Sequence, residues 1–390
     1  MKPRLIRITT VPLSLRVLLK GQHHFMAENG FAVKGVSSKG EDLYIVQQTE
    51  GIPVIPLEMT RMISPLKDLK SLWYFYRLCK KEKPMIVHSH TPKAGIIAML
   101  GAKFAGVPIR LHTVAGLPLM EATGVKRKLL DMVEKLTYRC ATMVYPNSKG
   151  LYDFILNNKF TTKERLKVIA NGSSNGIDTT FFNRSQVPEE QIARLRNDLE
   201  ISQTDFVFIF VGRLVGDKGI NELVEAFRML DTRGELQDMK LLLVGPLEAD
   251  LDPLLPKTLK EIETNPRIIS AGFQNDVRPY FAIADALVFP SYREGFPNVV
   301  MQAGAMGLPS IVSDINGCNE IIVEGQNGTI VPVKDSAGLS DAMFRLLTDK
   351  EYYGNLQKHA NGMIVRRYEQ RVVWNALLEE YKSLLKVKDG

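Results

Sequence analysis

The sequence has few cysteines and no long apolar run. Three cysteines, Cys79, Cys140 and Cys318, are scattered over 390 residues without metal-ligand spacing. Three is a small and odd number of cysteines, which excludes a disulfide scaffold. It predicts reduced, structural thiols in a cytoplasmic protein. No stretch approaches the ~20 apolar residues of a membrane span. The N-terminal apolar run is short and interrupted by Arg, unlike a signal peptide.

Signatures of several common ligand sites are also missing. The chain has neither a Gly-Lys-Ser/Thr phosphate loop nor a Gly-x-Gly-x-x-Gly turn after a strand. One Asp-x-Asp pair, Asp250 and Asp252, could suggest a metal site, but Pro253 beside it favours a helix start. We therefore expect no metal and no other cofactor. The net charge of +7 favours anionic partners, but no RNA-reading pattern of aromatic and basic residues occurs, so nucleic acid is not expected.

What is present is an alternation of short apolar runs with amphipathic segments along the whole chain. This pattern predicts parallel sheets covered by helices on both faces. A turn-rich run at 172–176, with two Gly and two Ser, marks a boundary after which the rhythm restarts. We predict an α/β protein with Rossmann-like, doubly wound domains at 1–175 and 176–365. A C-terminal helix at 366–390 has no strand after it and is expected to pack back on the first domain.

Within the first domain two further elements are expected. An amphipathic segment from Leu15 to Asn29 ends before Gly30, as a single helix would. A short apolar run, Leu166–Ile169, predicts a last strand before the boundary.

Two cations follow the first strand of the second domain. The apolar run that ends at Val211 continues as GRLVGDKG, in which Gly212 allows a turn and Arg213 stands at the strand end. Lys218 is expected to open the next helix. Two cations near a strand end and a helix N-terminus can neutralise a diphosphate. A surface Arg and Lys at a turn is the alternative interpretation.

A second segment, SYREGFPNVVMQAG, also joins a strand to a helix. Pro297 suits the first helical position, so that the amides of Asn298 and Val299 face an anion at the helix start. Glu294 beside that position would be a strong acceptor for sugar hydroxyls. Gln302, about two turns into the same helix, could hold a ribose. A helix-capping Glu and an exposed Gln are the alternative.

These residues resemble the retaining glycosyltransferases of family 4, which have the GT-B fold of two Rossmann-like domains facing across a cleft. The resemblance covers nearly the whole chain and is strongest in VGRLVGDKG, in the stretch around FPSYREGFPNVV, and in GLPSIVSDINGCNEII. The likeness is to enzymes of bacterial capsule, O-antigen and exopolysaccharide assembly. It implies donor-binding roles for the following residues: Gly212, Arg213, Lys218, Glu294, Gly295, Phe296, Asn298, Val299 and Gln302. The family has Glu where this chain has Gln302, so the charged grip on the ribose is missing.

The resemblance extends to two strand-end segments of the first domain, HSHTPKAG and RLHTVAGLP. In the second, His112 matches the family's active-site histidine and is expected to act with Glu294, Arg213 and Lys218. In the first, His88 and His90 are two apart and would share one face of a strand, with Ser89 opposite. His88 and His90 either serve the acceptor or are buried structural residues. Lys93 either meets an acceptor phosphate or is solvated.

The resemblance implies transfer of a sugar, with retention, from a nucleotide diphosphate sugar to a glycan or a polyprenyl-diphosphate-linked acceptor. UDP is the base expected on family grounds. A basic, aromatic-bearing segment at 64–83, with further positive charge at 126–128, allows peripheral contact with an anionic membrane at the inner face. The alternative is that one face packs on the sheet and the lysines are solvated. The alternatives are a sugar-nucleotide epimerase of related fold and a non-catalytic nucleotide-sugar-binding protein.

Overall fold

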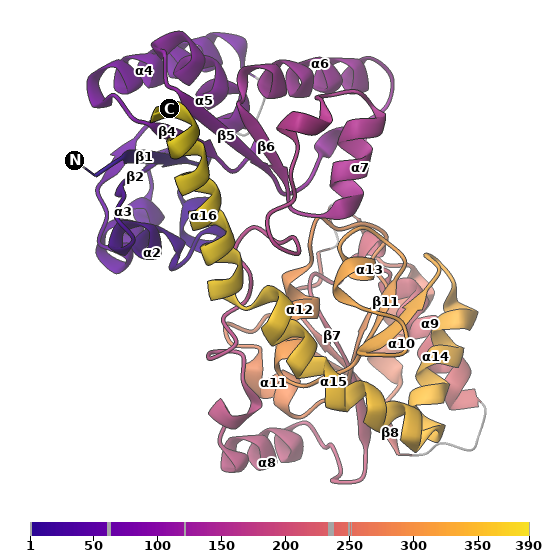
Figure 1. Ribbon diagram of the computed structural model, residues 1–390. Coiled ribbons are helices and arrows are strands. Elements are labelled where there is room, and N and C mark those ends of the chain that lie inside the picture. The colour runs from indigo at the N-terminus through magenta and orange to yellow at the C-terminus, as the bar shows by residue number, and fades with distance from the viewer. Residues whose placement is uncertain are drawn as a thin grey trace. The chain divides into compact units, whose positions relative to one another are not determined.

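The computed structural model describes residues 2–60, 64–120, 122–232, 238–248, 250 and 252–389. The chain divides into two compact units. Unit 1 consists of Met1–Gly176 together with Gln370–Gly390, and unit 2 is Ile177–Glu369. Each unit is a six-stranded parallel sheet with helices against it (Figure 1).

The sheet of unit 1 has the order β3-β2-β1-β4-β5-β6, and every pairing is parallel. Its strands are β1 (Arg4–Ile8), β2 (Ala32–Ser37), β3 (Val54–Pro56), β4 (Ile86–Ser89), β5 (Ile109–Val114) and β6 (Met143–Pro146). The central strands are buried on both faces, as their continuous apolar runs require. The strand order reverses between β1 and β4, which is the ligand-binding position of such sheets.

Eight α-helices belong to the described part of unit 1. They are α1 (Pro12–Leu18), α2 (Gln22–Glu28), α3 (Glu41–Glu50), α4 (Pro65–Glu82), α5 (Pro92–Ala105), α6 (Gly124–Cys140), α7 (Lys149–Asn157) and, after the excursion into unit 2, α16 (Gln370–Asp389), with 3-10 turns at Pro118–Met120 and Lys163–Arg165. The prediction of a single helix from Leu15 to Asn29 is wrong, because this segment forms parts of two helices, α1 and α2. Gly21 lies at the break with φ +77°, and a Cβ there would come 2.5 Å from the Trp374 ring.

The predicted strand Leu166–Ile169 is also absent from unit 1. Leu166 makes a single bridge to Val144, at the outer edge of β6. One bridge does not continue into a ladder, because Lys163–Arg165 just before it forms a 3-10 turn.

The C-terminal helix α16 packs on the sheet of unit 1. Trp374 and Tyr381 are buried in the same cluster as Leu5 and Ile86, and the Tyr145 hydroxyl donates to Glu380. The helix starts later than residue 366, because Glu369 has extended backbone (ψ 140°) and ends the preceding helix of unit 2.

Unit 2 repeats the same architecture with the order β12-β11-β10-β7-β8-β9. Its strands are β7 (Phe206–Val211), β8 (Met239–Val244), β9 (Ile268–Gly272), β10 (Ala286–Phe289), β11 (Ser310–Ser313) and β12 (Gly328–Val331). Here the order reverses between β7 and β10. The segments that follow these two strands are those in which the sequence predicted donor-binding residues.

The helices of unit 2 cover both faces of its sheet. They are α8 (Glu189–Asp198), α9 (Ile220–Thr232), α10 (Pro256–Thr264), α11 (Arg278–Ala282), α12 (Asn298–Ala305), α13 (Cys318–Ile321), α14 (Ser336–Thr348) and α15 (Lys350–Tyr368), with 3-10 turns at Arg184–Gln186 and Gly216–Lys218. Cys79, Cys140 and Cys318 are all free and buried, as predicted.

Candidate active site

The segments after β7 and β10 touch at the switch point of unit 2. Gly219 has φ +71°, and a Cβ at this position would come 2.1 Å from the Pro290 carbonyl oxygen. Only a glycine allows this approach. The contact brings the 3-10 turn Gly216–Lys218 against the loop that starts at Ser291. Lys218 therefore ends that turn, two residues before α9, rather than opening the helix as the sequence predicted.

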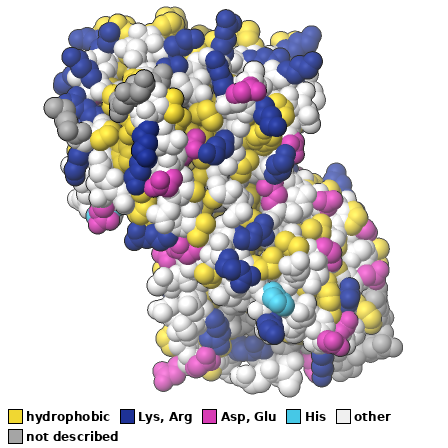
Figure 2. Space-filling model, in the orientation of Figure 1, with side chains coloured by type: hydrophobic (Ala, Val, Ile, Leu, Met, Phe, Trp, Pro, Cys, Tyr) yellow, Lys and Arg dark blue, Asp and Glu magenta, His cyan; other side chains and the backbone are white. Residues whose placement is uncertain are grey.

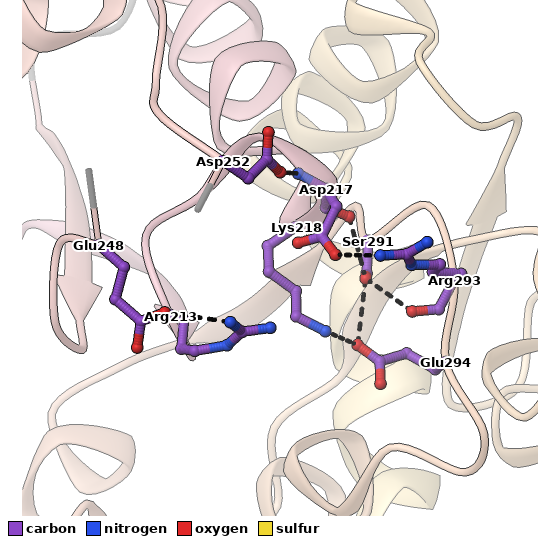
Figure 3. Close-up of polar contacts among 8 residues, drawn as sticks. All are labelled: Arg213, Asp217, Lys218, Glu248, Asp252, Ser291, Arg293 and Glu294. Atoms are coloured by element: carbon purple, nitrogen blue, oxygen red, sulfur yellow. Dashed lines mark hydrogen bonds and ion pairs between the residues drawn. The ribbon is translucent and has the colours of Figure 1, made fainter. Parts of the chain in front are cut away.

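Lys218 and Glu294 form an ion pair at this contact (Figure 3). The Lys218 ammonium lies 2.5 Å from Glu294 Oε1, and the two side chains are 16% and 18% exposed. The hydroxyl of the fully buried Ser291 lies 3.1 Å from the same carboxylate oxygen. The sequence predicted Lys218 for the diphosphate and Glu294 for the sugar. Because the two side chains are in direct contact, a ligand that binds beside them would meet a cation and a hydrogen-bond acceptor at the same position.

Arg213 lies at the end of β7, on the same side of the loops as Lys218 (Figure 3). Its guanidinium donates to Glu248 Oε2 over 3.0 Å, and nearly half of the side chain is exposed. An exposed ion pair of this kind contributes about 0–1 kcal/mol. Arg213 can therefore exchange Glu248 for an anionic ligand at little cost.

The helix α12 presents its first amides without a side-chain cap. The helix starts at Asn298, and Pro297 is its N-cap rather than its first residue, which corrects the sequence prediction. Among the described residues, no acceptor takes the amides of Gly295 and Phe296. Because Pro297 has no N–H, this loop offers donors at 295, 296, 298 and 299.

Gln302 lies one turn into α12, not two as predicted, because the helix begins four residues after Glu294. It is half-buried. Asn298 and Gln302 are four residues apart and so share one face of the helix. This places the Gln302 amide on the same side as the side chain of the first helical residue.

Beside these groups, unit 2 has a pocket of about 520 Å³ that the sequence did not predict. It is lined by Arg213, Val215, Asp217, Asp252, Tyr292 and Arg293. Arg293 Nη2 lies 3.0 Å from Asp217 Oδ2, across the two loops (Figure 3). Arg293 directly precedes Glu294 in the SYREGFP segment. This position in the sequence could have indicated that Arg293 lies at the site.

Asp252 has a structural partner. One of its carboxylate oxygens accepts the amide of Asp217 over 2.5 Å, which fastens the turn that carries Lys218. Within the described ranges, no three His, Cys, Asp or Glu side chains gather in a way that could hold a metal.

In unit 1, His112 lies on β5 and is only 2% exposed. Its Nδ1 lies 2.8 Å from the Ser89 hydroxyl, and burial lowers the pKa of the imidazole to about 4. The ring is therefore neutral at physiological pH. Gly95 of α5 makes room for it, because a Cβ at 95 would come 2.5 Å from His112 Cε1.

His88 and His90 share the other face of the sheet, with ring centroids 4.1 Å apart, as the two-residue spacing predicted. His88 is a structural residue in this arrangement: its Nδ1 lies 2.6 Å from the Tyr381 hydroxyl and its Nε2 lies 2.8 Å from the Thr113 hydroxyl. His90 is buried, and neither ring nitrogen has a partner in the described part of the chain. It lines a cavity of about 20 Å³, large enough for about one water molecule.

Lys93 is neither solvated nor free. Its ammonium lies 2.5 Å from Asp68 Oδ2 of α4, and the side chain is 12% exposed. An acceptor phosphate at this position would have to compete with that carboxylate.

Comparisons with known proteins identify the family of the chain. Residues 26–172 match the family description "Glycosyl transferase 4-like domain", and residues 191–363 match "Glycosyl transferases group 1". The capsular polysaccharide biosynthesis glycosyltransferase CapM of Staphylococcus aureus is 32% identical over 99% of both chains. An Escherichia coli UDP-Gal:alpha-D-GlcNAc-diphosphoundecaprenol alpha-1,3-galactosyltransferase is 30% identical, over 80% of this chain and 78% of its own.

Solved structures show the same fold. The chain superposes on Anabaena HepE, crystallised with UDP and glucose, with a TM-score of 0.79 and 18% identity over 98% of this chain and 100% of that one. The two six-stranded parallel sheets with their helices are those of the GT-B fold. The chain therefore belongs to the group 1, family 4-like glycosyltransferases.

Proposed function

We propose that the protein transfers a sugar, with retention, from a UDP-sugar to a lipid-linked or glycan acceptor in surface polysaccharide synthesis. One observation carries the proposal. Arg213 and Lys218 lie at the switch point of unit 2, Lys218 is paired with Glu294, and the helix α12, which has no side-chain cap, starts four residues after Glu294. Cations and uncapped amides suit a diphosphate, while a carboxylate beside them suits sugar hydroxyls.

In this scheme the leaving diphosphate gains charge as the sugar departs. Lys218, Arg213 and the loop amides stabilise that charge because they are already oriented before reaction. The leaving group takes the acceptor's proton, and no metal ion is needed. We further propose that His112, whose ring is neutral, donates one hydrogen bond during the reaction without adding charge.

The relatives support the acceptor class. The Escherichia coli enzyme uses a diphosphoundecaprenol acceptor, and so does a Campylobacter jejuni N-acetylgalactosaminyltransferase that is 25% identical over 91% of this chain. We propose the same kind of acceptor here.

A thermal-shift screen with UDP and UDP-sugars tests the donor. A ligand at 100 times its dissociation constant adds about 2.7 kcal/mol to the free energy of unfolding. We expect Arg213→Ala and Lys218→Ala to remove the shift. Glu294→Gln should keep the thermal shift with UDP but lose the additional shift that a UDP-sugar gives over UDP. The matched control is Lys257→Met, an exposed lysine of α10. Equal shifts in all variants would refute the site.

The transfer itself is tested with a diphosphoundecaprenol-linked sugar and the donor that gave the largest shift. Proton NMR of the product reports the configuration at the new anomeric carbon. Retention predicts the donor's configuration, and the opposite configuration would refute the mechanism. Release of free sugar or of an epimer, without a product on the lipid, would refute transfer to this acceptor.

We further propose that unit 1 contacts an anionic membrane. Helices α4 and α6 each pack against α5, and Lys and Arg side chains lie among hydrophobic ones along the upper edge of the view, where these helices are (Figure 2). The exposed large apolar residues of α4, α5 and α6 are Leu66, Leu69, Trp73, Tyr74, Phe104, Val125, Leu129, Met132 and Leu136. Such a face suits anionic headgroups with an apolar boundary below them. No helix among the described residues is long and apolar enough to cross a bilayer.

Co-sedimentation with phosphatidylglycerol vesicles tests this contact, with phosphatidylcholine vesicles for comparison. We expect binding only to the anionic vesicles. Leu66→Asp and Trp73→Ala should weaken it, whereas Tyr44→Ala, an equally exposed aromatic residue on α3, should not. Equal binding of all three variants would refute this surface.

A further inference from the structure

Asn316 links the loop after β11 to the donor loop after β10. Its side-chain amide Nδ2 donates to two successive backbone carbonyls, that of Glu294 over 3.1 Å and that of Gly295 over 2.6 Å. The sequence stretch GLPSIVSDINGCNEII, which carries part of the family resemblance, contains this residue, but no role was predicted for Asn316. The contact arises because β10 and β11 are neighbours in the sheet, so their carboxyl ends lie side by side.

Two hydrogen bonds to successive carbonyls fix the orientation of two peptide planes. A trans peptide is planar, and its N–H points opposite to its C=O. With the carbonyls of 294 and 295 turned toward Asn316, the N–H groups of Gly295 and Phe296 point away from it. In the part of the chain that the structure describes, neither N–H donates to an acceptor. The amides of Gly295 and Phe296 precede Asn298, the first residue of the uncapped helix α12, by three and two residues.

Gly317 closes the other side of this contact. It has φ +77°, and a Cβ there would come 2.7 Å from the Gly295 carbonyl oxygen and 2.9 Å from Phe296 Cα. The ring of Phe296 packs against that of Tyr368, with centroids 5.4 Å apart. The turn is thus held by hydrogen bonds, by close backbone approach and by packing, which leaves its peptide planes little freedom to rotate.

We infer that Asn316 is a positioning residue for the donor. It turns the Gly295 and Phe296 amides toward the donor's anionic oxygens, where they join the amides of Asn298 and Val299. Successive amides that converge in this way form an anion-binding concavity. The inference rests on the proposed function, because the oxygens it serves are those of the nucleoside diphosphate. Asn316 does not touch the donor and acts only through the backbone of the loop.

Three variants test this role, with UDP as the probe in calorimetric titrations of the full chain. Asn316→Ala removes both hydrogen bonds. Asn316→Asp keeps the size but presents a carboxylate, which cannot donate, to two carbonyl oxygens. Asn316→His restores one donor at a similar distance along the side chain. We expect UDP affinity to fall about tenfold with Ala, equivalent to about 1.4 kcal/mol, further with Asp, and less with His.

Asn319→Ala is the matched control, because Asn319 lies three residues further along the chain and donates to Asp314 over 2.8 Å rather than to the carbonyls of Glu294 and Gly295. It should bind UDP like the wild type. If Asn316 is merely structural, its variants will have a lower melting temperature but a UDP affinity within twofold of the wild type. This result would overturn the inference but leave the proposed function standing. Wild-type protein that bound neither UDP nor UDP-sugars would overturn the proposed function and the inference together.

Discussion

Gly95→Ala offers a test of how firmly His112 is held. In an ordinary helix interior this change adds about 0.5–1 kcal/mol of stability, because alanine loses less backbone entropy than glycine. In α5 the new Cβ would come 2.5 Å from His112 Cε1 and 3.0 Å from Nδ1, the atom that contacts Ser89. The ring is buried and packs beside Tyr138, so it cannot swing into solvent.

The cost of this overpacking is about 1–3 kcal/mol, and the lost hydrogen bond to Ser89 adds about 1 kcal/mol. The sum exceeds the gain in helix propensity, so we expect Gly95→Ala to destabilise unit 1 by about 1–3 kcal/mol. Because we propose that the His112 ring takes part in the reaction, we expect a displacement of about 1 Å to lower kcat by about 100-fold.

Urea unfolding followed by tryptophan fluorescence, together with single-turnover sugar transfer, measures both effects. Gly354→Ala is the control, because it makes the same change in helix α15 with nothing within 4 Å of the new Cβ. It should add up to about 1 kcal/mol and leave transfer unchanged. Gly95→Ala protein as stable and as active as the wild type would show that the His112 ring is not confined, and would refute this reasoning.

Three further predictions concern other parts of the chain. Burial lowers the pKa of His88 and His90 well below the usual value, so below pH 6.5 the unfolded chain takes up protons that the folded one does not. Thermal melts should therefore show stability falling as pH drops from 7 to 5, by up to about 1.4 kcal/mol per pH unit for each histidine; flat melting temperatures would contradict it. Tyr381→Phe removes the hydroxyl that contacts His88 and should cost about 1 kcal/mol in urea unfolding, with full activity retained. Gly317→Ala should lower UDP affinity at least as much as Asn316→Ala, because its Cβ meets backbone atoms that cannot move aside; unchanged affinity in titrations would show that the loop tolerates displacement.

The fold and the donor segments could be predicted from the sequence because both are local patterns. Apolar runs such as 206–211 are long enough to identify buried strands, and a Gly-rich run marks the boundary between the units. Breaks inside helices were missed. The bend at Gly21 depends on the Trp374 ring, which lies more than 350 residues away along the chain and carries no local signal.

The pairing of charges at the site could not be predicted in the same way. Residue types and spacing placed Lys218 and Glu294 near the carboxyl ends of strands, which is a property of the local segment. Their ion pair, however, depends on the contact of Gly219 with Pro290, and that contact exists only because β7 and β10 are neighbours in the folded sheet.

The amino-acid sequence by itself thus determined two parallel α/β units and the chemical groups available at the strand ends, because hydrophobic periodicity and turn residues act over a few positions. The tertiary structure alone decided which of those groups meet. Asn316 reaches the donor loop, Lys93 is joined to Asp68, and His112 is enclosed beside Gly95, since strand order and helix packing set distances between residues far apart in the chain.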